Sequence, residues 1–201
     1  MNFITLGESP RVDLVPELIK IIGRDFDYRE IGLLDDVSDY KNVSPENDND
    51  LYVSRLKNGS QIKLSKKWAK NKIKEMNLSG NSVILCTGDF GGLNIIQPSK
   101  SVNCFLNSLP KINKLAIVCP VREQVKSLCS RWDSFAKEVD YYYYSPYENK
   151  GVFPQRKKYD FIYLDCMGYT LEHEKLIGRN SDARTVSARK ILGNFLRCLI
   201  I

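Results

Sequence analysis

The sequence predicts an α/β protein built mainly from parallel sheets. Segments with the pattern of strands alternate with segments of helical periodicity along most of the 201 residues. The inner strands are continuous runs of Val, Ile, Leu and Phe, which is typical of parallel strands covered by helices on both faces. Polar turns follow these strands in both parts of the chain, which indicates two similar α/β halves facing each other.

The N-terminal segment has the pattern of a strand followed by a helix. Residues 3–7 alternate in polarity and end in glycine, as a strand that enters a turn does. Residues 12–23 then carry apolar side chains at helical spacing. We expect Asp13 to cap this helix, Pro16 to lie in its first turn and Gly23 to end it.

Residues 51–65 predict a β-hairpin, because two alternating arms flank Asn58-Gly59, the dipeptide favoured in a two-residue type I′ turn. Ser65 is then expected to cap a helix over residues 65–76. This helix is rich in lysine. The lysines indicate either a nucleic-acid patch or, more commonly, the solvated face of a surface helix.

The rest of the chain continues the alternation of strands and helices. Its buried strands and intervening helices follow from the same periodicity argument. We expect strands at 82–86, 114–119, 139–144 and 159–166, helices near 99–109, from Pro120 to about 137 and near 171–178, a polar loop over 145–158, and a short strand before a terminal helix capped by Ser187.

Composition excludes some classes of protein and leaves others open. Lys and Arg number 30 against 24 Asp and Glu, a net charge of +6 that suits an anionic small ligand or loose nucleic-acid contact and requires neither. No stretch approaches the ~18 apolar residues of a membrane span. The start, "MNFITLGESP", lacks the features of a signal peptide. We therefore expect a cytoplasmic protein without a membrane partner.

The cysteines do not predict a metal site. They form no CxxC pair and have no zinc-like spacing with His173, the sole histidine. In a reducing compartment they are expected to be thiols, either packed as small hydrophobes or reactive. His173 lies between two glutamates. We therefore favour a solvent-facing position on a helix over a catalytic role for this residue.

Two of these thiols, Cys86 and Cys166, stand at the ends of buried strands. Each is followed by a glycine and a threonine within four residues. A pair of thiols on opposite sides of one carbon can remove a proton from one face and return a proton to the other. The alternative is that each cysteine is a small buried residue that closes its strand, and both interpretations stay open.

The turns after the strands also offer groups for a carboxylate. Hydroxyls donate hydrogen bonds, glycines let backbone amides approach a ligand, and an arginine can bind two carboxylate oxygens. The alternative is that these residues only form ordinary turns and bind no ligand. For Arg11, the alternative is a position on the protein surface. The candidates are Ser9, Arg11, Thr87, Gly88, Gly168 and Thr170.

Four stretches, "LGESPRVDLVPEL", "ILCTGDF", "VCPVREQ" and "YLDCMGYT", together resemble the AroM family of bacterial proteins, whose pattern is approximately IGqSPRxDvvPe, CTGxF, VPxxEQ and DCMGYT. The likeness covers nearly the whole chain in the right order. That family is similar in turn to the aspartate/glutamate racemase superfamily, which has two pseudo-symmetric Rossmann-like lobes with a ligand cleft between them. Its members often use one cysteine from each lobe and work without pyridoxal phosphate or metal.

The resemblance implies specific roles. Cys86 and Cys166 fall at the acid/base positions of the two lobes, and Thr87 and Thr170 fall where hydroxyls hold a substrate carboxylate. Cys119 stands where the family usually has valine, and we interpret it as a packing residue. The predicted substrate-binding set becomes Ser9, Arg11, Thr87, Gly88, Gln124, Gly168, Tyr169 and Thr170.

These arguments predict a first lobe of residues 1–108 plus 186–201, with the hairpin inserted in it, and a second lobe of residues 109–185. The resemblance implies a cofactor-independent racemase or isomerase acting on a small carboxylate or amino acid. A non-catalytic protein that binds such a ligand is the alternative. Nucleic-acid binding through residues 65–76 is a weaker one. A homodimer also stays open.

Overall fold

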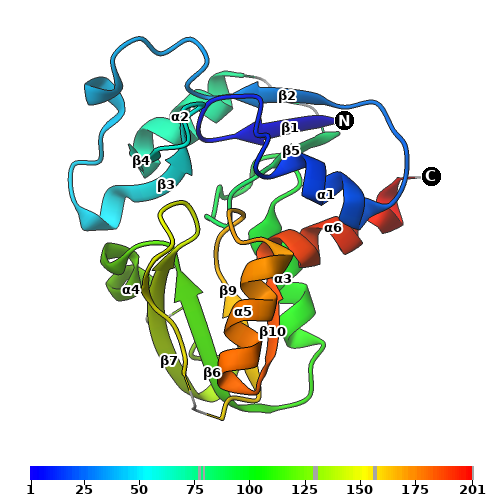
Figure 1. Cartoon of the computed structure of the whole chain (residues 1–201). Helices are drawn as coiled ribbons and strands as arrows, with labels where there is room; N and C mark the ends of the chain where they lie inside the picture. Colours follow the sequence, from blue (N-terminus) through cyan, green and yellow to red (C-terminus); the bar gives the residue numbers. More distant parts are fainter. Residues whose placement is uncertain (77, 79, 129–130, 156–157, 201) are drawn as a thin grey trace.

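The computed structural model describes residues 1–76, 78, 80–128, 131–155 and 158–200 of the chain. Within them, mainly parallel strands alternate with helices, so the predicted α/β class is confirmed. Figure 1 shows two units, one above the other: the upper unit is built on the N-terminal strands and the lower one on a larger sheet. The lobe boundaries predicted at 108/109 and 185/186 stay predictions.

The N-terminal sheet has the strand order β2-β1-β5, with all pairs parallel. Its strands are short, and β1 at the centre is almost completely buried. The order places the first strand of the chain between two later ones, so that the turns after β1 and β5 lie next to each other. The strands are β1 (Asn2–Thr5), β2 (Arg29–Gly32) and β5 (Ser82–Ile84).

The larger sheet has the order β10-β9-β6-β7-β8. Its pairs are parallel except for β7 with β8, which are antiparallel. Strands β6 and β9 are central and, apart from Asn113 and Lys114 near the start of β6, are apolar and buried, as expected for strands covered on both faces. The strands are β6 (Ile112–Cys119), β7 (Ala136–Ser145), β8 (Lys150–Val152), β9 (Phe161–Leu164) and β10 (Arg184–Ser187).

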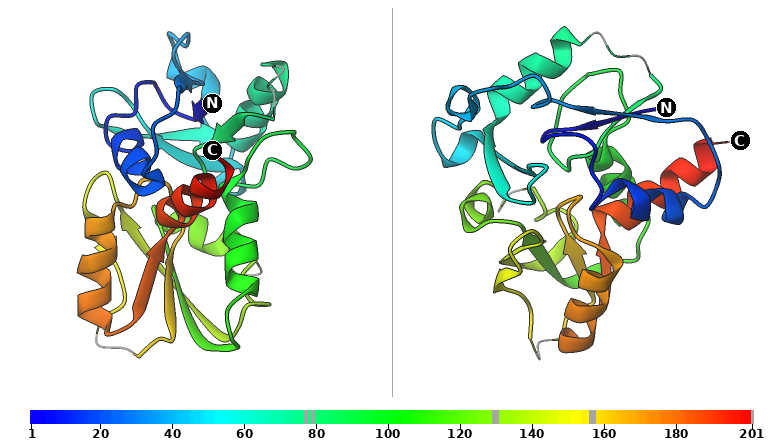
Figure 2. Two further views of the ribbon diagram at one scale, coloured as in Figure 1. Left: turned by 90° about the vertical axis from the view of Figure 1, so that its right-hand side faces the viewer. Right: turned by 45° about the horizontal axis from the view of Figure 1, so that its top comes forward.

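Helices cover both sheets, and the C-terminal helix returns to the first helix of the chain. Figure 2 shows α6 beside α1, where Gly193 fits so closely against Ile21 that a Cβ on the glycine would lie 2.5 Å from that side chain. The largest apolar cluster contains residues of both sheets. The helices are α1 (Val15–Ile22), α2 (Lys66–Glu75), α3 (Pro98–Asn107), α4 (Arg122–Leu128), α5 (Leu171–Ser181) and α6 (Ala188–Leu199), with short 3₁₀ turns at Tyr40–Val43 and Asp48–Asp50.

The helix ends agree with the sequence prediction at most positions. Ser65 Oγ accepts a hydrogen bond from the N–H of the third residue of α2 at 3.1 Å, and Ser187 caps α6 in the same way at 3.2 Å. Pro16 lies in the first turn of α1, and Gly23 ends that helix with φ of 64°. The expected cap at Asp13 is wrong, because Leu14 takes that position and the carboxylate of Asp13 holds an arginine instead.

The predicted hairpin is confirmed, but its turn is not the expected one. Strands β3 (Leu51–Arg55) and β4 (Gln61–Ser65) pair antiparallel. Only Gly59 has a positive φ, of 92°, and Asn58 does not. The Leu56 N–H donates to the Ser60 carbonyl at 2.9 Å, and the Gly59 N–H donates to the Leu56 carbonyl at 2.9 Å. This hydrogen bonding is typical of a longer loop with a left-handed glycine at its end.

Three further predictions need correction. The helix expected from Pro120 to about 137 ends at Leu128, since Ala136 already pairs with Ile112 in the sheet; residues 129–130 lie outside the described part. The polar loop 145–158 contains β8, and β2 had no counterpart in the sequence prediction. His173 is half-buried rather than solvent-facing, and its Nδ1 accepts a hydrogen bond from the Thr170 N–H at 3.0 Å.

In the described residues, no helix has both the length and the apolar character needed to cross a bilayer.

Candidate active site

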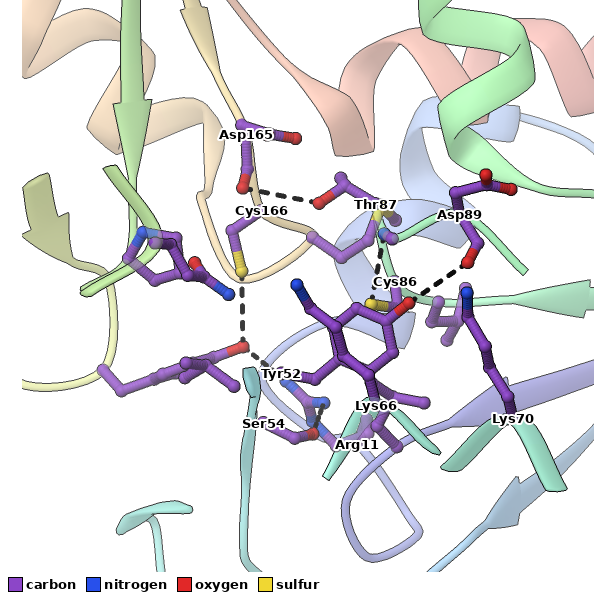
Figure 3. Close-up of a pocket in the computed structure, with 18 of the residues that line it drawn as sticks. Arg11, Tyr52, Ser54, Lys66, Lys70, Cys86, Thr87, Asp89, Asp165 and Cys166 are labelled. Carbon is purple, nitrogen blue, oxygen red and sulfur yellow. Dashed lines mark hydrogen bonds between the residues drawn. The ribbon is translucent and has the colours of Figure 1, made fainter. Parts of the chain in front are cut away.

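A cavity of about 240 Å³ is lined by residues that follow strands of both sheets, and Figure 3 shows the side chains around it. It is lined by the residues after β1, β5, β6, β7 and β9, and by parts of the hairpin and α2. The carboxyl ends of parallel strands are where open α/β sheets bind ligands. The predicted site residues that line it are Arg11, Cys86, Thr87, Gly88, Gln124 and Cys166.

The two cysteines have the same local structure. Cys86 Sγ accepts a hydrogen bond from the N–H of Gly88, two residues further on, at 3.4 Å. Cys166 Sγ accepts one from the N–H of Gly168 at 3.4 Å. The cavity-lining cysteines therefore lie in two equivalent turns, one after β5 and one after β9.

A tyrosine ring covers the glycine of each turn. A Cβ placed on Gly88 would lie 2.5 Å from the ring of Tyr52, and one placed on Gly168 would lie 2.7 Å from that of Tyr147. Both tyrosines line the cavity. Glycine is thus required at these two positions by the close approach of a ring, and each turn combines a cysteine, a glycine and a tyrosine.

Both cysteines are protonated thiols at neutral pH. Burial raises the pKa of Cys86 to about 12. Burial also raises the pKa of Cys166, although the Gly168 N–H, the Tyr147 hydroxyl and the charge of Arg11 act in the opposite direction. The hydroxyl of Tyr147 lies 3.8 Å from Cys166 Sγ. The two thiols therefore differ, and Cys166 has more groups that favour its thiolate.

Arg11 is buried, with 4% of its surface exposed, and its donors already have partners. Its Nε and Nη2 donate to the two carboxylate oxygens of Asp13 at 2.8 Å each. Its Nη1 donates to the Thr5 hydroxyl at 2.9 Å and to that of Ser54 at 3.4 Å. The remaining contact is with the Tyr147 hydroxyl at 3.5 Å. Arg11 thus lines the cavity as part of an internal ion pair.

Four predicted residues do not line the cavity. Ser9 Oγ donates to Asp35 on the outer side of its loop at 2.5 Å. Tyr169 is fully buried, and its hydroxyl donates to the Tyr144 carbonyl at 2.7 Å. Thr170 caps α5. Gly168 is buried, and its N–H donates a hydrogen bond to Cys166 Sγ rather than lining the cavity itself.

Gln124 and the other polar residues of the stretch "VCPVREQ" lie as follows. Gln124 reaches the hairpin, where its Nε2 donates to the Leu51 carbonyl at 3.4 Å. Glu123 points to the surface and pairs with Lys63 at 2.6 Å. Cys119 is fully buried and donates to the Val121 and Tyr142 carbonyls at 3.3 Å each, as a packing residue does. Cys129 lies outside the described residues.

Charged groups that the sequence did not indicate complete the cavity. Asp165 is buried, and burial raises the pKa of its carboxyl. Tyr163 donates to it at 3.2 Å, and Arg131 lies 3.9 Å from it. Arg131 also donates to the Thr87 carbonyl at 3.3 Å. Asp165 directly precedes Cys166 at the end of a strand. This position in the sequence could have indicated Asp165 as a site residue.

Further polar residues of the cavity were not predicted as site residues, although the lysines of residues 65–76 were noted as a possible nucleic-acid patch. They belong to the hairpin, to the helix after it and to the loops after β5 and β7, which fold over the strand ends: Tyr52, Ser54, Lys66, Lys70, Asp89 and Tyr147. In the part of the chain that the structure describes, no cluster of three or more His, Cys, Asp or Glu side chains is arranged to hold a metal ion.

A family model described as AroM protein matches residues 1–200. The chain belongs to the AroM family. Its structure is similar to that of allantoin racemase from Klebsiella pneumoniae, with a TM-score of 0.51 over 99% of this chain and 87% of that protein, at 8% sequence identity. At that identity the likeness concerns the fold, which is racemase-like. The comparison with curated proteins found no matching relative.

Proposed function

We propose that this AroM-family protein is a cofactor-independent racemase-like isomerase that moves a proton on a small carboxylate or amino acid, with Cys86 and Cys166 as the acid/base pair. The observation that supports this best is the presence of two cysteines in equivalent turns on the wall of one cavity. The racemase-like fold and the family membership are consistent with it.

In the proposed reaction, one cysteine in its thiolate form takes a proton from the substrate carbon, which keeps the electron pair as a carbanion. The other cysteine donates its thiol proton to the opposite face of that carbon and becomes the thiolate. Protons and charge balance, and the two cysteines have exchanged protonation states. Because burial holds both thiols protonated, the nearby cations and the hydrogen-bond donors of the turns must stabilise the first thiolate.

The cations of the cavity are suited to a negatively charged ligand. Lys66, Lys70 and Arg131 line it, whereas Arg11 is already paired with Asp13. Charge-assisted hydrogen bonds to a carboxylate are stronger than neutral ones. We therefore assign recognition of the carboxylate to Arg131, which lies beside the turn at Thr87 and Gly88, and to that turn itself, rather than to the whole set predicted from the sequence.

Proton exchange tests the proposal. The full chain is incubated in D₂O with amino acids, hydroxy acids, keto acids and allantoin, and loss of each carbon-bound proton is followed by NMR. We expect exchange with one class of substrate and its loss in Cys86→Ser and Cys166→Ser. Cys104→Ser is the matched control, because Cys104 is exposed and lies outside the cavity.

The second candidate function is binding without turnover, and the raised pKa values of both thiols favour it. A binding protein would retain affinity for its ligand in both serine variants and would show no exchange with any member of the panel. Exchange that persists in both variants would contradict the role of the cysteines.

A further inference from the structure

A row of lysines leads from the thiol cavity along α2. Lys66, Lys70 and Lys74 recur every four residues, so they lie on one face of the helix. Lys66 and Lys70 line the cavity that contains the cysteines (Figure 3). Both also line an adjoining surface groove, together with Lys67 and Lys74. The groove and the cavity therefore share a wall, and that wall is positively charged.

None of Lys66, Lys70 and Lys74 has an ion-pair partner among the described residues, although the charge of Asp50 raises the pKa of Lys66 in part. The Lys66 ammonium lies over the ring of Tyr52, 5.6 Å from its centre. Burial and the neighbouring Lys70 both lower the pKa of Lys66. Two ammonium groups thus repel each other at the cavity mouth, and a bound anion would relieve that repulsion.

Asp50 is the acidic residue among the described residues that line the groove, and its carboxylate is already engaged. One oxygen accepts the N–H of Lys67 at 3.0 Å, and the other accepts the N–H of Glu46 at 3.5 Å. Asp50 is therefore held at the N-terminus of α2, where its charge acts on Lys66 at the start of the helix. The lysines further along the helix are left to meet a ligand.

We propose that Lys66, Lys70 and Lys74 bind a phosphate or diphosphate group at the far end of the ligand whose reacting carbon lies between the two cysteines. The groove has four lysines and one aspartate, a surplus that matches a group with at least two negative charges better than a single carboxylate. Ammonium groups also bind phosphate as point charges without a fixed orientation. This subsite rests on the proposed function, because it assigns the distal part of the same ligand.

Calorimetric titration of the full chain with inorganic phosphate and inorganic pyrophosphate at constant ionic strength tests the subsite. We expect pyrophosphate to bind more tightly than phosphate, and Kd to rise about tenfold in Lys66→Gln and in Lys70→Gln, as loss of one charge-assisted contact implies. Lys72→Gln is the matched control, since Lys72 lies on the same helix and lines neither the cavity nor the groove.

The outcomes separate this subsite from the proposed chemistry. Pyrophosphate binding that depends on Lys66 and Lys70 and survives in Cys86→Ser supports the subsite even if no substrate exchanges a proton. Absence of pyrophosphate binding, or an equal loss in Lys72→Gln, overturns the subsite and leaves the exchange result unaffected. A short single-stranded RNA that binds more tightly than pyrophosphate, with affinity falling steeply in salt, would overturn it in favour of a nucleic-acid surface.

Discussion

The hydroxyl of Tyr147 lies 3.8 Å from the sulfur of Cys166, and it is the link between that thiol and the buried Arg11. Both groups favour the Cys166 thiolate. Asp165 and Cys166 raise the pKa of Cys86 beyond the effect of burial, whereas Arg131 lowers it. Asp165 also raises the pKa of Cys166. The equivalent turns therefore surround the two thiols with different groups, and we propose Cys166, with more groups that favour its thiolate, as the base that acts first.

Replacing Tyr147 by phenylalanine should weaken this effect. Without the hydroxyl, the pKa of Cys166 rises further, because a hydrogen bond that stabilises the thiolate is removed. Alkylation of Cys166 by iodoacetamide, followed by peptide mass spectrometry, should slow severalfold at pH 8, with Cys86 unchanged. Tyr142→Phe is the control, since that hydroxyl contacts Tyr159 and lies outside the cavity. Equal slowing of both cysteines would contradict the assignment.

Proton exchange should increase with pH above neutrality. Burial raises the pKa of both thiols, that of Cys86 to about 12, so the fraction of protein with one thiolate grows by about tenfold per pH unit until the lower of the two pKa values is reached. Exchange rates measured by NMR from pH 6.5 to 9.5 are expected to follow this increase. A rate that is flat over that range would show that neither thiol titration limits the reaction.

The same shifts predict how stability depends on pH. In the folded state Cys86 releases its proton at a higher pH than in the unfolded chain, where its pKa is near 9.0. Its contribution to stability is therefore complete below pH 9 and is lost as the pH rises toward about 12. Urea unfolding of Cys86→Ser should be less sensitive to alkaline pH than that of the wild type. A parallel decline of both proteins would contradict this expectation.

Adding a methyl group at Gly88 should disturb the site. The new Cβ would lie 2.5 Å from the Tyr52 ring, so the ring has to move, at a cost of about 1–3 kcal/mol. Gly88→Ala is expected to lose this stability in urea unfolding and to lower exchange activity. Gly92→Ala provides the matched control, because its Cβ would have no neighbour within 4 Å. Similar behaviour of the two variants would mean that the ring does not depend on the glycine.

Arg189 should prove essential for the turn that carries Cys166. It is fully buried on α6 and donates from Nε and Nη2 to the Met167 carbonyl at 3.0 and 2.8 Å. Its Nη1 pairs with Glu17 at 2.6 Å, which ties the turn to α1. Arg189→Ala removes both donors to the Met167 carbonyl and leaves Glu17, which also accepts the Leu171 N–H, without its ion-pair partner, and it should cost about 3–5 kcal/mol in urea unfolding.

Arg179→Ala, at an exposed position on α5, is the corresponding control and should be neutral within about 0.5 kcal/mol. At moderate urea concentrations that leave the chain folded, Cys166 should be alkylated more slowly in Arg189→Lys than in Arg189→Ala. Wild-type stability of Arg189→Ala would show that the turn is held by other contacts.

Features of the fold that depend on residues close together in the sequence were predictable. Apolar runs indicated the parallel strands, Pro16 and Gly23 indicated the limits of α1, and Ser65 and Ser187 indicated two helix starts, because each depends on contacts within a few residues. The short edge strands β2 and β8 were missed, since β8 is exposed, β2 is only partly buried, and both have little hydrophobic patterning. Their pairing is set by the strands beside them.

By itself, the sequence determined the α/β class, the family and the positions of two cysteines at strand ends. The tertiary structure decided what surrounds them: it gave Arg11 to Asp13, placed Tyr52 and Tyr147 over the glycines and brought the lysines of α2 to the cavity. These contacts join segments far apart in the chain or depend on which of several partners a side chain reaches. Local periodicity carries no information about them, because they follow from how the hairpin and loops pack over the ends of the strands.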